Sequence, residues 1–362
     1  MLHHWLQAID RSFYDNSDSF SIGNHLIPLS KDGNNLSSVR VAIFSDTNPS
    51  NDFWRKELYK LSHGFDHDSI ADLGILRNNT PEVVIPVIKE LVSAGILPIF
   101  ISNDPQLTDA VFLAYRSFGK KINVLLADER IRYTGANGEP QIIDKMLQPD
   151  IRDWVRPGLI GHQQHFIHKH LKSLLTDHCY DNYRLGQLIS NLGEAEPIIR
   201  HADLMIWNMS VLDGSKYSGT LNPSPNGIDG LTACTLCKYA GMSDKMSSMV
   251  FTGFAPENDQ HNITAQLLAQ MIWYFLDGFT HRCNDYPKSF DGLQPFMIDS
   301  KKIGFDLMFW KSRHSGRWWV QLSSQIITTE DKPDLYPCSQ DEYQASAKGE
   351  VPDRILNYLS SN

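Results

Sequence analysis

The sequence predicts an α/β fold in which helices cover both faces of a mainly parallel sheet. Short apolar runs without alternation recur along the chain, and segments with helical apolar spacing separate them. Strands buried on both faces of a parallel sheet read as such runs, and a helix usually connects one parallel strand to the next. The 362 residues accommodate two ordinary domains or one large α/β domain with additions, and the absence of a long linker favours the second.

Each predicted element has its own local signal. Buried strands are expected at residues 39–44, 96–101, 122–126, 202–207 and 248–252. Helices are expected where apolar residues return every three or four positions, at residues 53–61, 81–92, 105–115, 234–240 and 264–279. Thr80 and Pro81 provide a cap and a first-position proline for the second helix, and Gly95 ends it.

The C-terminal part has a different pattern. Residues 303–310 and 318–322 are two aromatic-rich strands on either side of a turn that contains Gly316, which predicts a β-hairpin. Its aromatic side chains either pack within the subunit or form a surface for another subunit or a partner protein. These side chains are Phe309, Trp310, Trp318 and Trp319.

Composition excludes several classes of function. The 33 basic and 42 acidic residues give a formal charge of −9, which disfavours a nucleic-acid-binding protein. No apolar run approaches the ~20 residues that span a bilayer, and the start of the chain lacks the pattern of a secretory signal. The 5 cysteines are typical of reduced thiols rather than a disulfide framework. We therefore expect a soluble, cytoplasmic protein without a membrane or nucleic-acid partner.

Two local clusters contain metal-ligating residue types. Cys234 and Cys237 are a single pair in an apolar helical pattern, so buried core thiols are a better interpretation than a metal or redox site. A second cluster holds four histidines, which either lie on the surface or contribute to a metal site if they share a helix face. These are His162, His165, His168 and His170. Neither cluster identifies a function.

Four longer blocks carry more information. They lie in order at residues 95–108, 124–132, 206–229 and 253–269, and each joins a strand to a polar or glycine-rich loop. Together they resemble the ureohydrolase family of arginase, agmatinase and formimidoylglutamase, and most of all its bacterial formimidoylglutamase-like branch. The resemblance implies a three-layer αβα domain at residues 38–285, an N-terminal extension at 1–37 and a C-terminal extension at 286–362 packed on the same domain. It also implies a homo-oligomer.

The residues at the family's metal positions differ from the family pattern. Ureohydrolases hold two Mn²⁺ ions with two His and four Asp. The matching positions here carry Pro105, Asp128, Arg130, Arg132, Asn208 and Ser210. Only Asp128 is a family ligand, proline has no side-chain donor, and arginine keeps its proton. The resemblance therefore implies a degenerate site without the manganese cofactor.

The neighbouring positions of this vestigial pocket are also informative. Gly253 matches the position of the family's substrate-contacting Glu, while Asp104 and Asp213 remain acidic. Arg130 or Arg132 either pairs with Asp104 or Asp128, projects into solvent, or binds an anion.

Three functions follow from these observations. The leading hypothesis is a catalytically inactive ureohydrolase-fold protein that acts in binding or scaffolding. The second is an active formimidoylglutamase-like amidine hydrolase, either metal-free or with an atypical metal site that uses His162, His165 or Asp213. The third is a small-molecule sensor that clamps an anion between Arg130 and Arg132.

Overall fold

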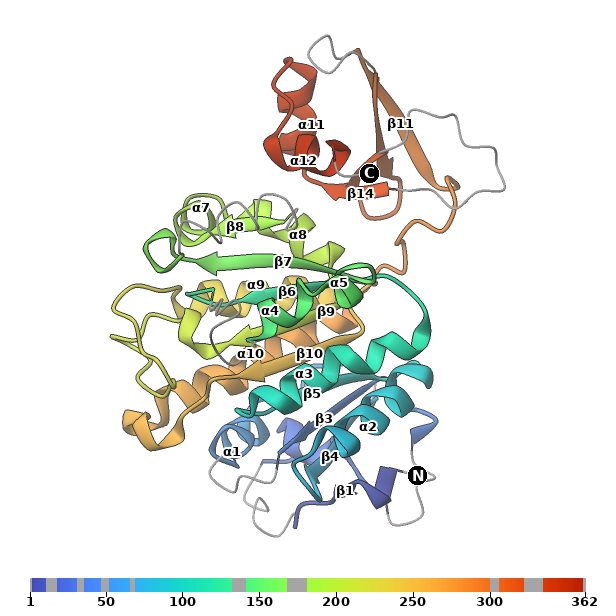
Figure 1. The fold of residues 1–362 in the computed structure, drawn as a ribbon. Helices are drawn as coiled ribbons and strands as arrows, with labels where there is room; N and C mark the ends of the chain where they lie inside the picture. The colour runs from blue at the N-terminus through green and yellow to red at the C-terminus, as the bar shows by residue number, and fades with distance from the viewer. Residues whose placement is uncertain are drawn as a thin grey trace.

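The central feature is a mainly parallel sheet (Figure 1). The computed structural model describes residues 2–10, 18–30, 36–46, 52–65, 69–131, 141–167, 181–299, 306–321 and 335–360. Within these residues the sheet has 10 strands. Their order is β1 (Leu6–Gln7), β4 (Ile70–Leu76), β3 (Val41–Ser45), β5 (Leu97–Ile101), β10 (Ser248–Thr252), β9 (Leu204–Asn208), β6 (Ile122–Ala127), β7 (Val155–His162) and β8 (Asn182–Arg184), with β2 (Ile27–Pro28) beside β4.

Five of these strands were predicted from the sequence, and β4 and β7 were not. The predicted strands correspond to β3, β5, β6, β9 and β10. β7 contains Arg156, Pro157 and two glycines, and β4 contains Asp72 and Gly74, so neither reads as an apolar run. The N-terminal residues expected as an extension contribute β1 and β2, and β1 is antiparallel to β4.

Helices cover both faces of this sheet, which confirms the three-layer αβα architecture. One layer holds α1 (Asp52–Lys60), α7 (Leu185–Ser190), α8 (Ala195–His201), α9 (Gly230–Met242) and α10 (Ile263–Thr280). The opposite layer holds α2 (Pro81–Ser93), α3 (Pro105–Ala114), α4 (Ile142–Met146) and α5 (Pro149–Arg152). Side chains of β5 alternate between the two cores, with Ile99 on one face and Phe100 on the other.

The helix boundaries follow local signals. α2 begins at Pro81 after Thr80, as predicted, and Gly95 follows its end with a φ of 73°. α9 begins four residues earlier than expected, because the carboxylate of Asp229 accepts a hydrogen bond from the Thr232 amide at 2.8 Å and caps it. Cys234 is buried in α9 and burial raises its pKa to about 12, as expected for a core thiol.

Across the described residues we find no helix with the length and apolar character that crossing a membrane requires.

The C-terminal region forms a second, antiparallel sheet with its own helices (Figure 1). It comprises β11 (Leu293–Ile298), β12 (Leu307–Ser312), β13 (Trp318–Gln321), β14 (Leu335–Cys338), α11 (Gln340–Ala347) and α12 (Asp353–Ser360). The predicted hairpin is β12–β13, which pairs Phe309 with Val320, whereas β11 and β14 were not predicted. Phe309 and Trp319 are fully buried within the subunit, so these two rings do not form an exposed surface.

A buried polar network joins this second sheet to the αβα core. The carboxylate of Asp181 lies 3.1 Å from Nδ1 of His201 at the end of α8. It also accepts hydrogen bonds from Nη1 of Arg354 at 3.2 Å and from the hydroxyl of Tyr336. Nearby, Nη2 of Arg200 donates to the carbonyl of Cys338 at 3.2 Å. These contacts connect β14 and α12 to the core through groups that have little access to water.

Candidate functional site

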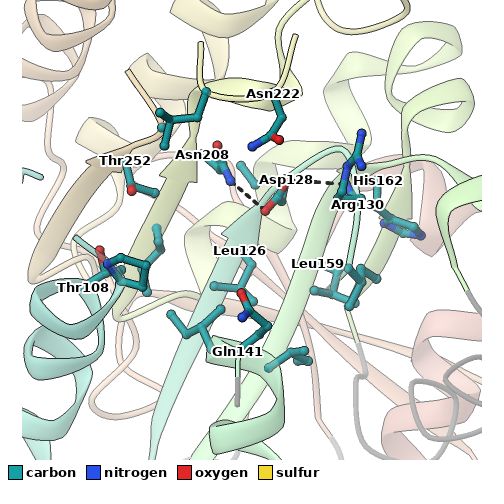
Figure 2. A pocket seen from close by; sticks show the side chains of 18 of the residues that line it. Thr108, Leu126, Asp128, Arg130, Gln141, Leu159, His162, Asn208, Asn222 and Thr252 are labelled. Atoms are coloured by element: carbon teal, nitrogen blue, oxygen red, sulfur yellow. Dashed lines mark hydrogen bonds between the residues drawn. The ribbon is translucent and has the colours of Figure 1, made fainter. Parts of the chain in front are cut away.

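A cavity of about 160 Å³ lies at the carboxyl ends of the central parallel strands (Figure 2). Neighbouring parallel strands end at the same edge of a sheet, and open α/β sheets bind ligands at this edge. β5, β6, β7, β9 and β10 all end here. The polar lining residues that follow or end these strands are Asn103, Asp128, Arg130, His162, Asn208 and Thr252.

The cavity collects most of the positions to which the sequence resemblance assigns the family's metal ligands. Pro105, Asp128, Arg130 and Asn208 line it, together with Gly253. Ser210 is buried behind the wall, and Arg132 lies outside the described residues. The two other positions expected around this pocket, Asp104 and Asp213, are not part of the wall.

Asp104 and Asp213 have other roles. Asp104 caps α3, and its Oδ1 accepts a hydrogen bond from the amide of Gln106 at 2.8 Å. Asp213 is held in its own turn, where the Ser215 hydroxyl and the ammonium of Lys216 at 3.1 Å lower its pKa. Their assignment to the vestigial pocket is therefore corrected, because local capping and turn contacts direct both carboxylates elsewhere.

A chain of hydrogen bonds connects Ser210, Asn208, Asp128 and the backbone amide of Arg130, and its last two links are drawn in Figure 2. Oδ1 of Asn208 accepts from the backbone amide and the hydroxyl of Ser210, at 3.0 and 2.8 Å. Nδ2 of Asn208 then donates to Oδ2 of Asp128 at 2.9 Å, and the amide of Arg130 donates to Oδ1 of Asp128 at 3.3 Å. Both polar atoms of the Asn208 side chain therefore have partners. The Nδ2 donor points toward the Asp128 carboxylate, and the Oδ1 acceptor points toward Ser210.

Arg130 has a partner that the sequence analysis did not consider. Its guanidinium pairs with the carboxylate of Glu129 at 2.7 Å and stacks over the ring of Phe166, 4.3 Å from its centroid. The predicted pairing of Arg130 with Asp104 or Asp128 is therefore wrong. Glu129 is fully buried and would be an unpaired charge without this guanidinium. The same pairing for Arg132 falls outside the described residues.

Gly253 is required by the geometry of the cavity wall. It has a φ of 79°, and a Cβ at this position would lie 2.3 Å from Oδ1 of Asn208. The Asn208 amide therefore occupies the space that any side chain at position 253 would need. Positions 208 and 253 are therefore structurally coupled, and a glutamate at 253 would not fit while Asn208 keeps its place.

His162, at the end of β7, lines the cavity and is only 1% exposed. Its Nδ1 is enclosed and has no hydrogen-bond partner among the described residues. Burial, with a smaller contribution from the positive charge of Arg184, lowers the pKa of His162 to about 4. The imidazole is therefore neutral at pH 7.

The rest of the histidine cluster does not share this environment. His165 is exposed on a short 3-10 turn and its ring lies against Phe166. His168 and His170 lie outside the described residues. The helical spacing considered in the sequence analysis does not apply, because His162 ends a strand.

The buried neutral state of His162 predicts a pH dependence of stability. Its pKa is about 4 in the folded chain and 6.5 in the unfolded chain, so the unfolded chain binds more protons between these values. The free energy of unfolding should therefore fall as the pH is lowered from 6.5 to 4.5. His162 should account for about 2 kcal/mol of this decrease in unfolding free energy. Its contribution is the decrease measured for the wild type minus the decrease measured for His162→Leu, both from urea titrations. His165→Leu is the matched control and should lose stability with pH as the wild type does.

The described residues do not fit a binuclear manganese centre. Within them, no group of three or more His, Cys, Asp or Glu is placed to hold a metal ion. Hard divalent ions need oxygen and imidazole ligands, but Asn208 turns its amide nitrogen toward Asp128. Pro105 supplies no donor, and Arg130 adds a positive charge to the same cavity. The donor set therefore opposes the cofactor that the resemblance implies.

Several lining residues were missed in the sequence analysis. Asn103 and Thr252 lie at the ends of strands that were predicted, so their position was a usable signal. Gln141 lies between β6 and β7, and Asn222 lies between β9 and β10, each more than ten residues from the nearest strand of the large sheet. Only the folded structure brings them to the cavity. Most of the remaining wall is apolar.

Comparison with known proteins agrees with this architecture. The strand order and the cavity define an open α/β protein with a site at the carboxyl ends of its strands. Formiminoglutamase of Trypanosoma cruzi with Mn²⁺ superposes with a TM-score of 0.60 at 15% identity, over 69% of this chain and 96% of that one. Agmatine ureohydrolase of Thermoplasma volcanium gives 0.53 at 14%, over 74% and 97%. A hypothetical agmatinase from Burkholderia thailandensis gives 0.55 at 12%, over 68% and 87%.

The chain therefore has the arginase/ureohydrolase fold, as the sequence blocks implied. No model of a protein family and no curated protein sequence matches the chain. At this level of identity the structural similarity establishes the fold alone.

Proposed function

We propose that this ureohydrolase-fold protein binds a small molecule without the family's binuclear manganese centre and without amidine hydrolysis. The observation that carries the proposal is the hydrogen bond from Asn208 to Asp128 at 2.9 Å. It places an amide donor where the resemblance expects a metal-binding carboxylate, and the amide satisfies the remaining Asp128 directly. A carboxylate that accepts hydrogen bonds from N–H donors does not require a cation to satisfy its oxygens.

The cavity itself supports a binding role. It combines an apolar wall with a few polar groups, which is the usual composition of a small-molecule site. The predicted anion clamp receives less support, because Glu129 already matches the charge of Arg130. A scaffolding role through the C-terminal aromatic residues also receives less support, since Phe309 and Trp319 are buried within the subunit.

Metal content is the measurement that tests the proposal. The purified chain should hold less than about 0.1 equivalent of manganese after incubation with excess Mn²⁺ and desalting, because the ligands are absent. It should also fail to hydrolyse formimidoylglutamate, agmatine and arginine. The formiminoglutamase of Trypanosoma cruzi, treated in the same way and measured by plasma mass spectrometry, is the positive control.

A hydrolase with an atypical metal site is the alternative, and one observation favours it. His162 presents an unpartnered imidazole in the same cavity as Asp128. One or two equivalents of tightly held metal, or turnover of any of the three substrates, would establish this alternative and overturn the binding proposal. His165 and Asp213 are not part of this cavity wall.

A further inference from the structure

Much of the cavity wall is apolar. Aliphatic side chains from β6, β7, β9 and α4, and from the segment after β6, line it together with the polar residues, and Leu126 and Leu159 are labelled in Figure 2. They are Leu126, Ile131, Ile142, Ile143, Leu159 and Ile206. Burying a ligand's hydrocarbon against such a wall is favourable, whereas burying a polar chain there leaves its hydrogen bonds unmade.

Each ionic group of the described lining already has a hydrogen-bond or ion-pair partner. Arg130 pairs with Glu129 at 2.7 Å, and Asp109 pairs with Lys145. Asp128 accepts hydrogen bonds from Asn208 and from the amide of Arg130. A charged ligand would lose its hydration in this cavity and would have to compete with these partners for the ionic groups of the described lining.

His162 is a buried polar group of the lining that has no hydrogen-bond partner among the described residues. Its ring lines the cavity, and within the described residues neither of its nitrogens makes a hydrogen bond. Nδ1 is enclosed by protein, so Nε2 is the nitrogen that can meet a ligand. Whether Nε2 donates or accepts depends on the tautomer, and a carboxamide offers both an acceptor oxygen and a donor N–H.

We infer that the ligand is an uncharged amphipathic molecule, with an aliphatic body against the apolar wall and a carboxamide-type head hydrogen-bonded to His162. The inference rests on the proposed binding function and specifies the class of ligand. It accounts for three features together: the apolar wall, the ionic groups that already have partners, and the unpartnered imidazole.

A series of small probes on the full wild-type chain tests the inference. Butanamide, hexanamide, hexylamine and hexanoate are titrated at pH 7.5, and binding is followed by ligand-observed NMR. Hexanamide should bind at least tenfold more tightly than hexylamine and hexanoate, which have the same chain length but a charged head. It should also bind about fifteenfold more tightly than butanamide, because it buries two more methylenes and each contributes about fourfold.

Variants at position 162 test the hydrogen bond. His162→Leu should weaken hexanamide binding about tenfold, while His162→Gln, which keeps a donor and an acceptor, should recover part of the affinity. His165→Leu is the matched control and should bind as the wild type does. The probe series on the wild type decides the question even if a variant fails to fold.

The outcomes separate this inference from the proposed function. Tighter binding of hexylamine would replace it with a cationic ligand, and tighter binding of hexanoate would replace it with an anionic one. Absence of binding by all four probes at 10 mM would also overturn it. None of these results changes the metal content, which tests the proposed function separately.

Discussion

Replacing Asn208 by aspartate should destabilise the folded chain by about 2–4 kcal/mol at pH 8 and by much less at pH 5. The new carboxylate would lie where Nδ2 of Asn208 now donates to Asp128 at 2.9 Å. Two carboxylates at this distance cannot both ionise without a cation, so one acquires a raised pKa. A group with a raised pKa in the folded state contributes stability at low pH and loses it as the pH rises through that value.

Urea titrations of Asn208→Asp at pH 5 and pH 8 measure this effect. Asn222→Asp introduces the same charge on the cavity wall, at a residue with no bond to Asp128 among the described contacts, and is the matched control. The control should change little with pH. Equal destabilisation of Asn208→Asp at both pH values would argue against the hydrogen-bond chain as the replacement for the metal.

Arg354→Met is expected to cost about 3–5 kcal/mol of unfolding free energy, because it removes one partner from a buried ionic network. Arg354 donates to Asp181 at 3.2 Å and to Glu342 at 2.6 Å, and also to the carbonyl of Pro337 at 2.9 Å. Its loss leaves two nearly buried carboxylates with fewer donors. Since Asp181 belongs to the core and Glu342 to α11, the loss also weakens the junction between the two sheets.

Urea unfolding followed by tryptophan fluorescence and circular dichroism tests this expectation. Arg313→Met, at an exposed arginine in the turn between β12 and β13, is the control and should stay within about 0.5 kcal/mol of the wild type. A loss below 1 kcal/mol in Arg354→Met would mean that the network does not hold the C-terminal sheet on the core.

The spacing of apolar residues along the chain predicted the strands that are buried on both faces and the helices that have one continuous apolar face. β5 is apolar along its length, β6 is apolar from Val124 onward, and α2 and α10 have a continuous apolar face. These patterns are local, so the elements could be predicted without knowing which other elements pack against them. β4 was missed because its buried Asp72 looks like a turn residue. In the folded chain Arg55 pairs with it at 2.9 Å, and only tertiary contact makes that carboxylate compatible with a strand.

The sequence by itself determined the α/β class, the ureohydrolase-like order of blocks and the residue types at the family's metal positions. These depend on residue identity and on spacing along the chain. Only the tertiary structure decided how the residues at these positions pair: Asn208 bridges to Asp128, Arg130 turns to Glu129, and Gly253 leaves room for the amide. Such pairings depend on directions and distances across strands that lie far apart in the sequence, because a hydrogen bond requires alignment within about 3 Å.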